Sequence, residues 1–339
     1  MNTPQLDTRT DATVGVFPQL GVDGSTVMVV VIKQRFCLGI DGSVDPEPGA
    51  KIRPVDVPWD PDADVSSPKY PGDLCIRKPS TDVIIVGYAV AREEKPTREL
   101  DVHVRVGPVE KRIRVFGLRV WFKSLGSYAL TPPQAFVRQP VKWESAYGGM
   151  DASDPQRAVH EPRNPMGTGV AGDPAALVHR PAPSIEDPAD LIKSHRSRPA
   201  PAGIAAIGPN FQPRQKYAGT MDQKWQDERM PIPPLDFDDR FNHVAAPGMI
   251  APSYLRGGEE VAITSMHRSG AVAFKLPRRS FFVGAELDGA LKEARPALDT
   301  VLIEPTDLLM EMTWRSAIPS PRPARRLRAI QVFEKASIG

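Results

Sequence analysis

The sequence predicts a mainly β protein of antiparallel sheets or a sandwich, with a long ordered Pro/Gly-rich loop region in the middle and few short helices. Three observations lead to this fold class. Short β-branched runs fill both ends of the 339-residue chain. The chain has 37 prolines, about twice the usual share of roughly 5%, and prolines penalise helix interiors and central strands. The middle third places aromatic residues among its prolines and glycines, which a disordered linker would lack.

The first part of the chain, about residues 14–140, is predicted to form strands. Residues 25–38 are rich in valine and isoleucine, and Asp41-Gly42 after them predicts a turn. Residues 81–91 are a second β-branched run. In residues 100–106 and 109–116 apolar residues alternate with polar and charged ones, which predicts an antiparallel hairpin with one face in water.

The central region, about residues 141–250, shows little periodicity. We expect prolines, glycines and side-chain hydrogen bonds to hold its backbone. Short helical turns are predicted at residues 187–194, where Asp187-Pro188 resembles a helix start, and at residues 221–228.

Short strand-like runs return in the last part, about residues 251–335. In residues 308–314 a large apolar residue alternates with residues of the opposite face, two of which are polar. Asp288-Gly289 predicts a hairpin, although residues 285–294 also fit a short helix. Strands at both ends predict a single domain, residues 1–339, whose two halves share a sheet or a sandwich.

Charge and hydropathy limit which classes of partner and which cellular compartment we expect. The net charge is only +2, so there is no global electrostatic reason to expect nucleic acid or an anionic membrane as partner. The N-terminus shows no signal-peptide pattern, and the most apolar run, residues 27–32, is far shorter than the ~20 residues that a membrane span needs. We therefore expect a cytoplasmic protein.

Most enzyme signatures are absent from the sequence, and it gives no reason to expect a metal or another cofactor. Residues 167–172 match G-x-G-x-x-G but follow no predicted strand, which argues against a dinucleotide site. Asp236, Asp238 and Asp239 beside Arg240 have two interpretations. They form an acid–base or metal site, or they form a turn in which the aspartates accept from backbone N–H groups and pair with the arginine.

The aromatic residues of the central region also have two interpretations. They anchor long loops to the β body, or some of them form an aromatic and arginine surface of the kind that dominates protein–protein contacts. The candidate protein-binding residues, taken together with their polar neighbours, are Trp143, Glu144, Tyr147, Asp151, Arg163, Asn164, Trp225, Asp236, Asp238, Arg240 and Phe241.

Three blocks of the central region resemble a known family. They are WESAYGGMD at residues 143–151, EPRNPMGTG at residues 161–169 and DFDDRF at residues 236–241. With these sequence blocks in this order, the chain resembles a bacterial adaptor family catalogued as domain of unknown function 2169 and linked to type VI secretion. One departure is that Pro162 and Arg163 stand between Glu161 and Asn164 of the second block.

The resemblance implies a non-catalytic adaptor or chaperone. Such a protein would hold a secreted effector toxin and help load it on the spike, a VgrG trimer or a PAAR protein. The resemblance brings no catalytic residues with it. An enzyme is the alternative, namely a β-rich hydrolase or carbohydrate-active enzyme that uses Asp236 and Asp238, or Glu144 and Asp151. A structural part of the injection machine is a third hypothesis.

Overall fold

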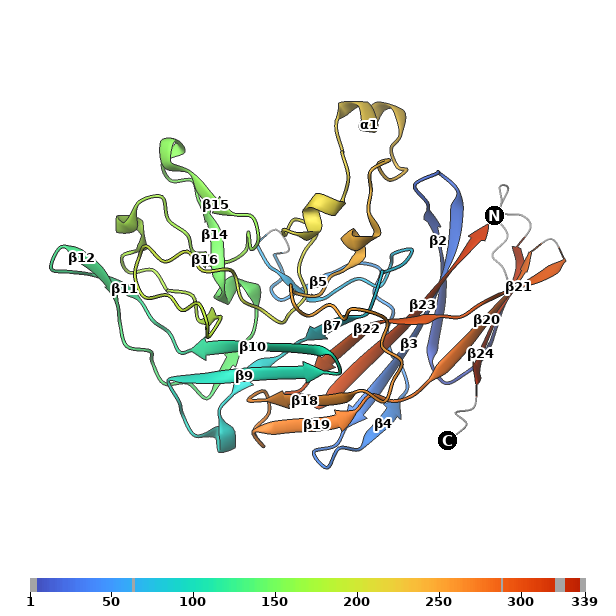
Figure 1. The fold of residues 1–339 in the computed structure, drawn as a ribbon, viewed down its shortest axis with the longest axis horizontal. Coiled ribbons are helices and arrows are strands. Elements are labelled where there is room, and N and C mark those ends of the chain that lie inside the picture. The colour runs from blue at the N-terminus through green and yellow to red at the C-terminus, as the bar shows by residue number, and fades with distance from the viewer. Residues whose placement is uncertain (1–4, 63–64, 288, 321–326, 336–339) are drawn as a thin grey trace.

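A computed structural model, shown in Figure 1, describes residues 5–62, 65–287, 289–320 and 327–335. The chain is mainly β, as predicted, and three sheets make up its body. The short elements of the central region lie at one side and at the top of the view.

The largest sheet has six strands and joins the two ends of the chain. Strand β3 pairs antiparallel with β23 along its length, so an N-terminal strand and a C-terminal strand form the middle of one sheet. The strands in spatial order are β2 (Thr13–Leu20), β3 (Thr26–Leu38), β23 (Leu309–Ser320), β22 (Ala297–Glu304) and β7 (Asp82–Ile85), with β4 (Val44–Glu47) paired to β3 off this path.

The second sheet has five strands and confirms the predicted hairpin. Val102, Val104 and Val106 are buried on one face, whereas Asp101 and Arg105 on the other face are exposed. This sheet also mixes the two halves of the chain, because β9 pairs with β18. Its order is β17 (Ile185–Glu186), β10 (Val109–Phe116), β9 (Glu99–Val106), β18 (Glu260–Thr264) and β19 (Ala271–Lys275).

A four-stranded sheet lies near the described ends of the chain (Figure 1). The predicted turn at Asp288-Gly289 falls partly outside the described residues, because Asp288 is not among them. The strands on either side, β20 and β21, pair antiparallel as a hairpin requires, and the alternative of a short helix is wrong. The order is β1 (Gln5–Arg9), β24 (Leu327–Lys335), β20 (Ser280–Leu287) and β21 (Ala290–Ala294).

Shorter strands and helices lie outside these three sheets, connected by long loops. Four small groups of strands pair as β5 (Val57–Pro58) with β6 (Pro68–Tyr70), β8 (Tyr88–Val90) with β13 (Arg138–Pro140), β11 (Trp121–Ser124) with β12 (Ser127–Leu130), and β14 (Tyr147–Asp151) with both β15 (Val159–Glu161) and β16 (Thr168–Gly169). The helices are α1 (Gln223–Glu228) and the 3-10 turns η1 (Arg92–Glu94), η2 (Trp143–Ser145), η3 (Pro155–Arg157), η4 (Pro174–Leu177), η5 (Arg214–Tyr217) and η6 (Asp239–Asn242).

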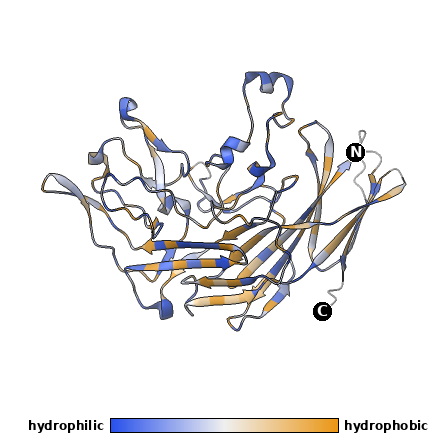
Figure 2. Ribbon diagram, viewed as in Figure 1, coloured by the Kyte–Doolittle hydropathy of each residue, from blue (hydrophilic) through white to orange (hydrophobic). Residues whose placement is uncertain are grey.

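The main core lies between the sheets and is built from their inward-facing valines, isoleucines and leucines together with loop residues of the central region. Figure 2 shows the apolar colour concentrated on the strands of the large sheets, whereas α1 is hydrophilic. No helix within the described ranges is long and apolar enough to cross a membrane.

Two predictions about local structure need correction. The run at residues 81–91 is two strands rather than one, because the chain turns at Gly87 (φ 143°) between β7 and β8. The helical turn expected at residues 187–194 is wrong, because Asp187 accepts from the N–H of Ala189 (2.8 Å) in a local turn instead. The alternation predicted for residues 308–314 forms in β23, and its polar residues Glu311 and Thr313 are buried as well; Lys33 and Arg53 from distant segments pair with Glu311.

Candidate functional site

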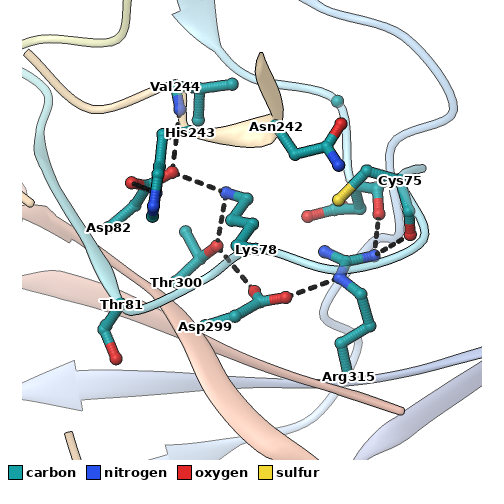
Figure 3. A network of polar contacts seen from close by, with 12 residues as sticks. Cys75, Lys78, Thr81, Asp82, Asn242, His243, Val244, Asp299, Thr300 and Arg315 are labelled. Carbon is teal, nitrogen blue, oxygen red and sulfur yellow. Dashed lines mark hydrogen bonds and ion pairs between the residues drawn. The ribbon is translucent and has the colours of Figure 1, made fainter. Parts of the chain in front are cut away.

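A buried polar network lies where the loop before β7 meets β22 and β23. Figure 3 shows Lys78 between Asp82 and Thr300, with Nζ 2.8 Å from an oxygen of each. Asp299 accepts from Thr300 (2.8 Å) and from the Nε of Arg315 (2.5 Å). We call Lys78, Asp82, His243, Asp299, Thr300 and Arg315 the buried polar network, since all six are almost fully enclosed.

Charges in this network stabilise one another. Burial alone would raise the pKa of Asp82, but the ammonium of Lys78 and the hydrogen bond from His243 outweigh it, so the pKa is lowered. Burial alone would lower the pKa of Arg315, but the attraction of Asp299 outweighs it, and the pKa is raised. The enclosed side chains therefore hold β7, β22, β23 and the end of η6 together.

The network continues into a second set of buried charges. Arg315 donates to the backbone carbonyl of Asp73, and the carboxylate of Asp73 accepts from Lys33 (2.8 Å) on β3. Glu311 lies 3.2 Å from Lys33 and pairs with both terminal nitrogens of Arg53 (2.6 and 3.0 Å). The loop between β6 and β7 is thereby fixed on the six-stranded sheet.

Sequence reasoning missed this set of charges. A signal was present, because Lys33, Asp299 and Glu311 are charged residues inside otherwise apolar strand-like runs. Such residues are rare in buried strands unless they are paired.

The first block of candidate residues forms an ordered module around β14. Trp143 is buried, stacks edge-on against Phe211 with ring centroids 5.7 Å apart, and donates from Nε1 to the carbonyl of Ala205 (3.3 Å). Asn164 is fully buried and donates to the carbonyls of Trp143 (2.9 Å) and Tyr147 (3.0 Å). These contacts show the loop-anchoring role that was one of the two interpretations.

Acidic candidates of the same module accept hydrogen bonds from its loops. Glu144 accepts from the N–H (2.7 Å) and the hydroxyl (2.8 Å) of Ser67, which ties the module to the loop before β6. Asp151 accepts from Ser153 and from the N–H of Gly172 (3.0 Å), and the Ser153 hydroxyl contributes most to its lowered pKa. The carboxylates of the module therefore fix its backbone.

Arg163 is the exposed member of the module. It forms a bidentate ion pair with the carboxylate of Glu161, with N–O distances of 2.7 and 2.6 Å, and its side chain is 48% exposed. The hydrogen bonds from Arg163 are the main reason that the pKa of Glu161 is lowered.

The second group of candidate residues forms a separate module between η5 and η6. Asp238 accepts from the N–H of Arg240 (2.8 Å) and pairs with its guanidinium (2.6 Å), which lowers the pKa of Asp238 to about 2. Arg240 lies over the ring of Tyr217 (4.2 Å), and Phe241 packs edge-on against Phe237 (5.7 Å). The turn interpretation of Asp236, Asp238 and Arg240 therefore describes their contacts.

The segment between these 3-10 turns projects from the body with α1 near its tip (Figure 1). We call residues 219–236 the α1 projection. It carries Trp225 on α1 and Asp236 at its base, and its exposed apolar side chains include Met221, Met230 and Leu235. On the first module, Met150 of β14 is exposed in a similar way.

The fold and the site define a β-rich protein whose central loops are held in shape by polar side-chain contacts and expose several large apolar side chains. The chain belongs to the family described as "Uncharacterized protein conserved in bacteria (DUF2169)", whose family model matches residues 23–315. No curated protein and no solved structure matched this chain.

Proposed function

We propose that this protein is a cytoplasmic, non-catalytic adaptor or chaperone that binds a type VI secretion effector and helps to load it on the VgrG or PAAR spike. The blocks of the central region that resemble an adaptor family support this proposal. The structural observation that carries it is the use of the central carboxylates: Glu144, Asp151, Asp236 and Asp238 accept hydrogen bonds that hold two projecting modules in shape.

Such modules suit protein binding for a physical reason. A surface that is ordered before it binds loses less conformational entropy on association. Exposed Met150 and Met230 add flexible, polarisable side chains, which adapt to irregular apolar partners. Together these features favour a binding module with a protein partner.

The enzyme alternative is less well supported by the same residues. A general acid that works near neutral pH needs a carboxyl group with a raised pKa. The pKa of Asp151, Asp236 and Asp238 is instead lowered, in each case mainly by hydrogen bonds to the carboxylate. The pKa of Glu304 is raised by burial, but this side chain is enclosed and accepts from Tyr70 (2.7 Å).

A pulldown tests the proposal. The tagged protein is expressed at native level in its own bacterium, isolated from the cytoplasm, and analysed by mass spectrometry of what it retains, with the tag alone as control. We expect one toxin encoded near the gene, together with a VgrG or PAAR protein. A folded protein that retains neither partner would overturn the proposal.

Fractionation separates the adaptor from a part of the injected particle. An adaptor stays in the cytoplasm while the toxin leaves, and deletion of its gene should stop export of that toxin alone. If the protein itself appears in the secreted fraction with the spike, it is a component of the particle and not an adaptor.

A further inference from the structure

The α1 projection is closed at its base by side-chain contacts. Asp236 accepts from the N–H (2.8 Å) and the hydroxyl (2.7 Å) of Thr220, which joins the two arms of the projection. Gly219 has φ +81°, and a Cβ there would lie 2.7 Å from Pro234, so the arms approach too closely for a side chain at this position. Both arms are thus held at a fixed distance from each other.

Its tip is held by α1. Asp222 caps the helix by accepting from the N–H of Trp225 (2.8 Å), and Trp225 donates across to the carbonyl of Ile232 (2.9 Å) on the other arm. Arg229 donates to the carbonyl of Pro233 (2.6 Å) and to the carbonyl of Val22 in the turn between β2 and β3. The projection is therefore fixed both internally and against the body.

Between α1 and the second arm lies an open groove of about 400 Å³. Its apolar lining comes from Trp225, Ile232, Pro234 and Leu235. Leu235 is 78% exposed, and Met230 at the turn beside the groove is 64% exposed. This volume is at the lower end of ligand pockets, about 300–1,000 Å³, so it suits a side chain and its neighbours.

The charged rim of the groove carries one carboxylate more than it has cations, a net formal charge of −1. Its lining includes three carboxylates, those of Asp222, Glu228 and Asp236, against the two cations Lys224 and Arg229. The guanidinium of Arg229 is bound to two backbone carbonyls, and the carboxylates of Asp222 and Asp236 accept from Trp225 and Thr220. Exposed Glu228 is the rim carboxylate that is left to meet a ligand. The rim therefore complements a cationic ligand beside an apolar one.

We propose that this groove binds a segment of a partner protein that places a large aliphatic or aromatic side chain against Trp225 and Leu235 and a lysine or arginine beside Glu228. This inference rests on the proposed adaptor function and specifies where one partner docks. The exposed Met221 and Met230 extend the apolar surface beyond the groove, which suits a protein segment better than a small molecule.

Two short synthetic peptides test the chemistry. Both carry the same leucine and phenylalanine residues, which are flanked by lysines in one peptide and by glutamates in the other, and binding is followed by fluorescence anisotropy of a label. We expect the full-length protein to bind the lysine peptide at least about tenfold more tightly, a ratio that corresponds to ~1.4 kcal/mol. Equal binding of the two peptides, or binding of neither, would overturn the inference.

Variants locate the binding on the groove. Leu235→Asp adds a negative charge. If the lysine peptide bound by non-specific charge attraction alone, this substitution would strengthen binding. If the peptide occupies the groove, loss of the apolar contact should weaken binding by about tenfold or more. Glu228→Lys should weaken it as well. Leu291→Asp on β21 is the matched control, since Leu291 is a leucine 57% exposed outside the projection. Unchanged binding by Leu235→Asp, or an equal loss in Leu291→Asp, would place the peptide elsewhere and refute the groove.

The same variants separate this inference from the proposed function. Suppose that the wild-type protein retains a toxin and a spike protein in the pulldown. If the double variant Leu235→Asp/Glu228→Lys retains the same partners in the same amounts, the groove is refuted and the adaptor proposal stands. Loss of one partner in that variant, with the other partner retained, supports the groove and assigns it to the lost partner. If the wild-type protein retains neither partner, the adaptor proposal itself fails.

Discussion

Replacing Asp299 with asparagine should destabilise the protein severely, because it leaves the guanidinium of Arg315 buried without its anionic partner. The side chain of Arg315 is only 3% exposed, and its Nε lies 2.5 Å from Asp299. Removing one partner of a buried ion pair costs about 3–5 kcal/mol. Folded proteins are typically stable by about 5–15 kcal/mol, so this one substitution removes a large fraction of the total.

The control is a carboxylate–guanidinium ion pair at the surface. Glu161 and Arg163 approach to 2.6 Å, but the arginine side chain is 48% exposed. Solvent screens such a pair, so Glu161→Gln should cost about 1 kcal/mol or less. The comparison varies burial while the chemistry of the pair stays the same.

Urea unfolding followed by tryptophan fluorescence measures both changes. The double variant Asp299→Asn with Arg315→Met should recover part of the loss, because it removes the unpaired buried charge. If Asp299→Asn costs no more than Glu161→Gln, or if the second substitution adds its full cost instead of recovering stability, the reasoning about burial is refuted.

Three further predictions concern single side chains. Asn164→Ala should lose about 2–5 kcal/mol in urea unfolding, since two buried carbonyls lose their donor; a loss below ~1 kcal/mol would contradict this. The pKa of Asp82 is lowered in the folded protein, so its carboxylate stabilises the fold above about pH 4, and this stabilisation is lost as the pH falls through the folded-state pKa. In a pH series of unfolding curves, the stability advantage of the wild type over Asp82→Asn should therefore shrink below about pH 4. A difference that stays constant with pH would refute this prediction. Burial lowers the pKa of Lys111 from 10.5 to about 8. Between about pH 8 and 10.5 the unfolded chain is therefore protonated at Lys111 while the folded protein is not, so the stability of the wild type should rise with pH relative to that of Lys111→Met. Melting temperatures of the two proteins that change with pH by the same amount over this range would contradict the prediction.

The sequence by itself determined the features that depend on neighbouring residues. Alternation in residues 100–106 and 109–116 determined which side chains of β9 and β10 face the core, because successive side chains in a strand point to opposite faces. The helical turn predicted at residues 221–228 forms as α1, where the carboxylate of Asp222 caps the helix by accepting from the N–H of Trp225. These are short-range effects, and they do not depend on the rest of the chain.

The burial of each candidate residue depends on contacts that the local sequence does not specify. The blocks of the central region marked the residues that build both modules, but composition alone did not separate buried Trp143 and Asn164 from exposed Arg163. Burial of Trp143 depends on Phe211 and Ala205, which lie far along the chain. Local sequence carries no signal for such contacts.

Only the tertiary structure decided what covers each face of a strand and how its charges are paired. The pattern of residues 308–314 correctly separated Met310 and Met312 from Glu311, yet both faces of β23 are buried over residues 310–316. Glu311 is enclosed because Lys33 and Arg53 reach it from distant segments of the chain. A strand's alternation specifies that side chains share a face, whereas whether water or protein meets that face depends on the folding of remote loops over it.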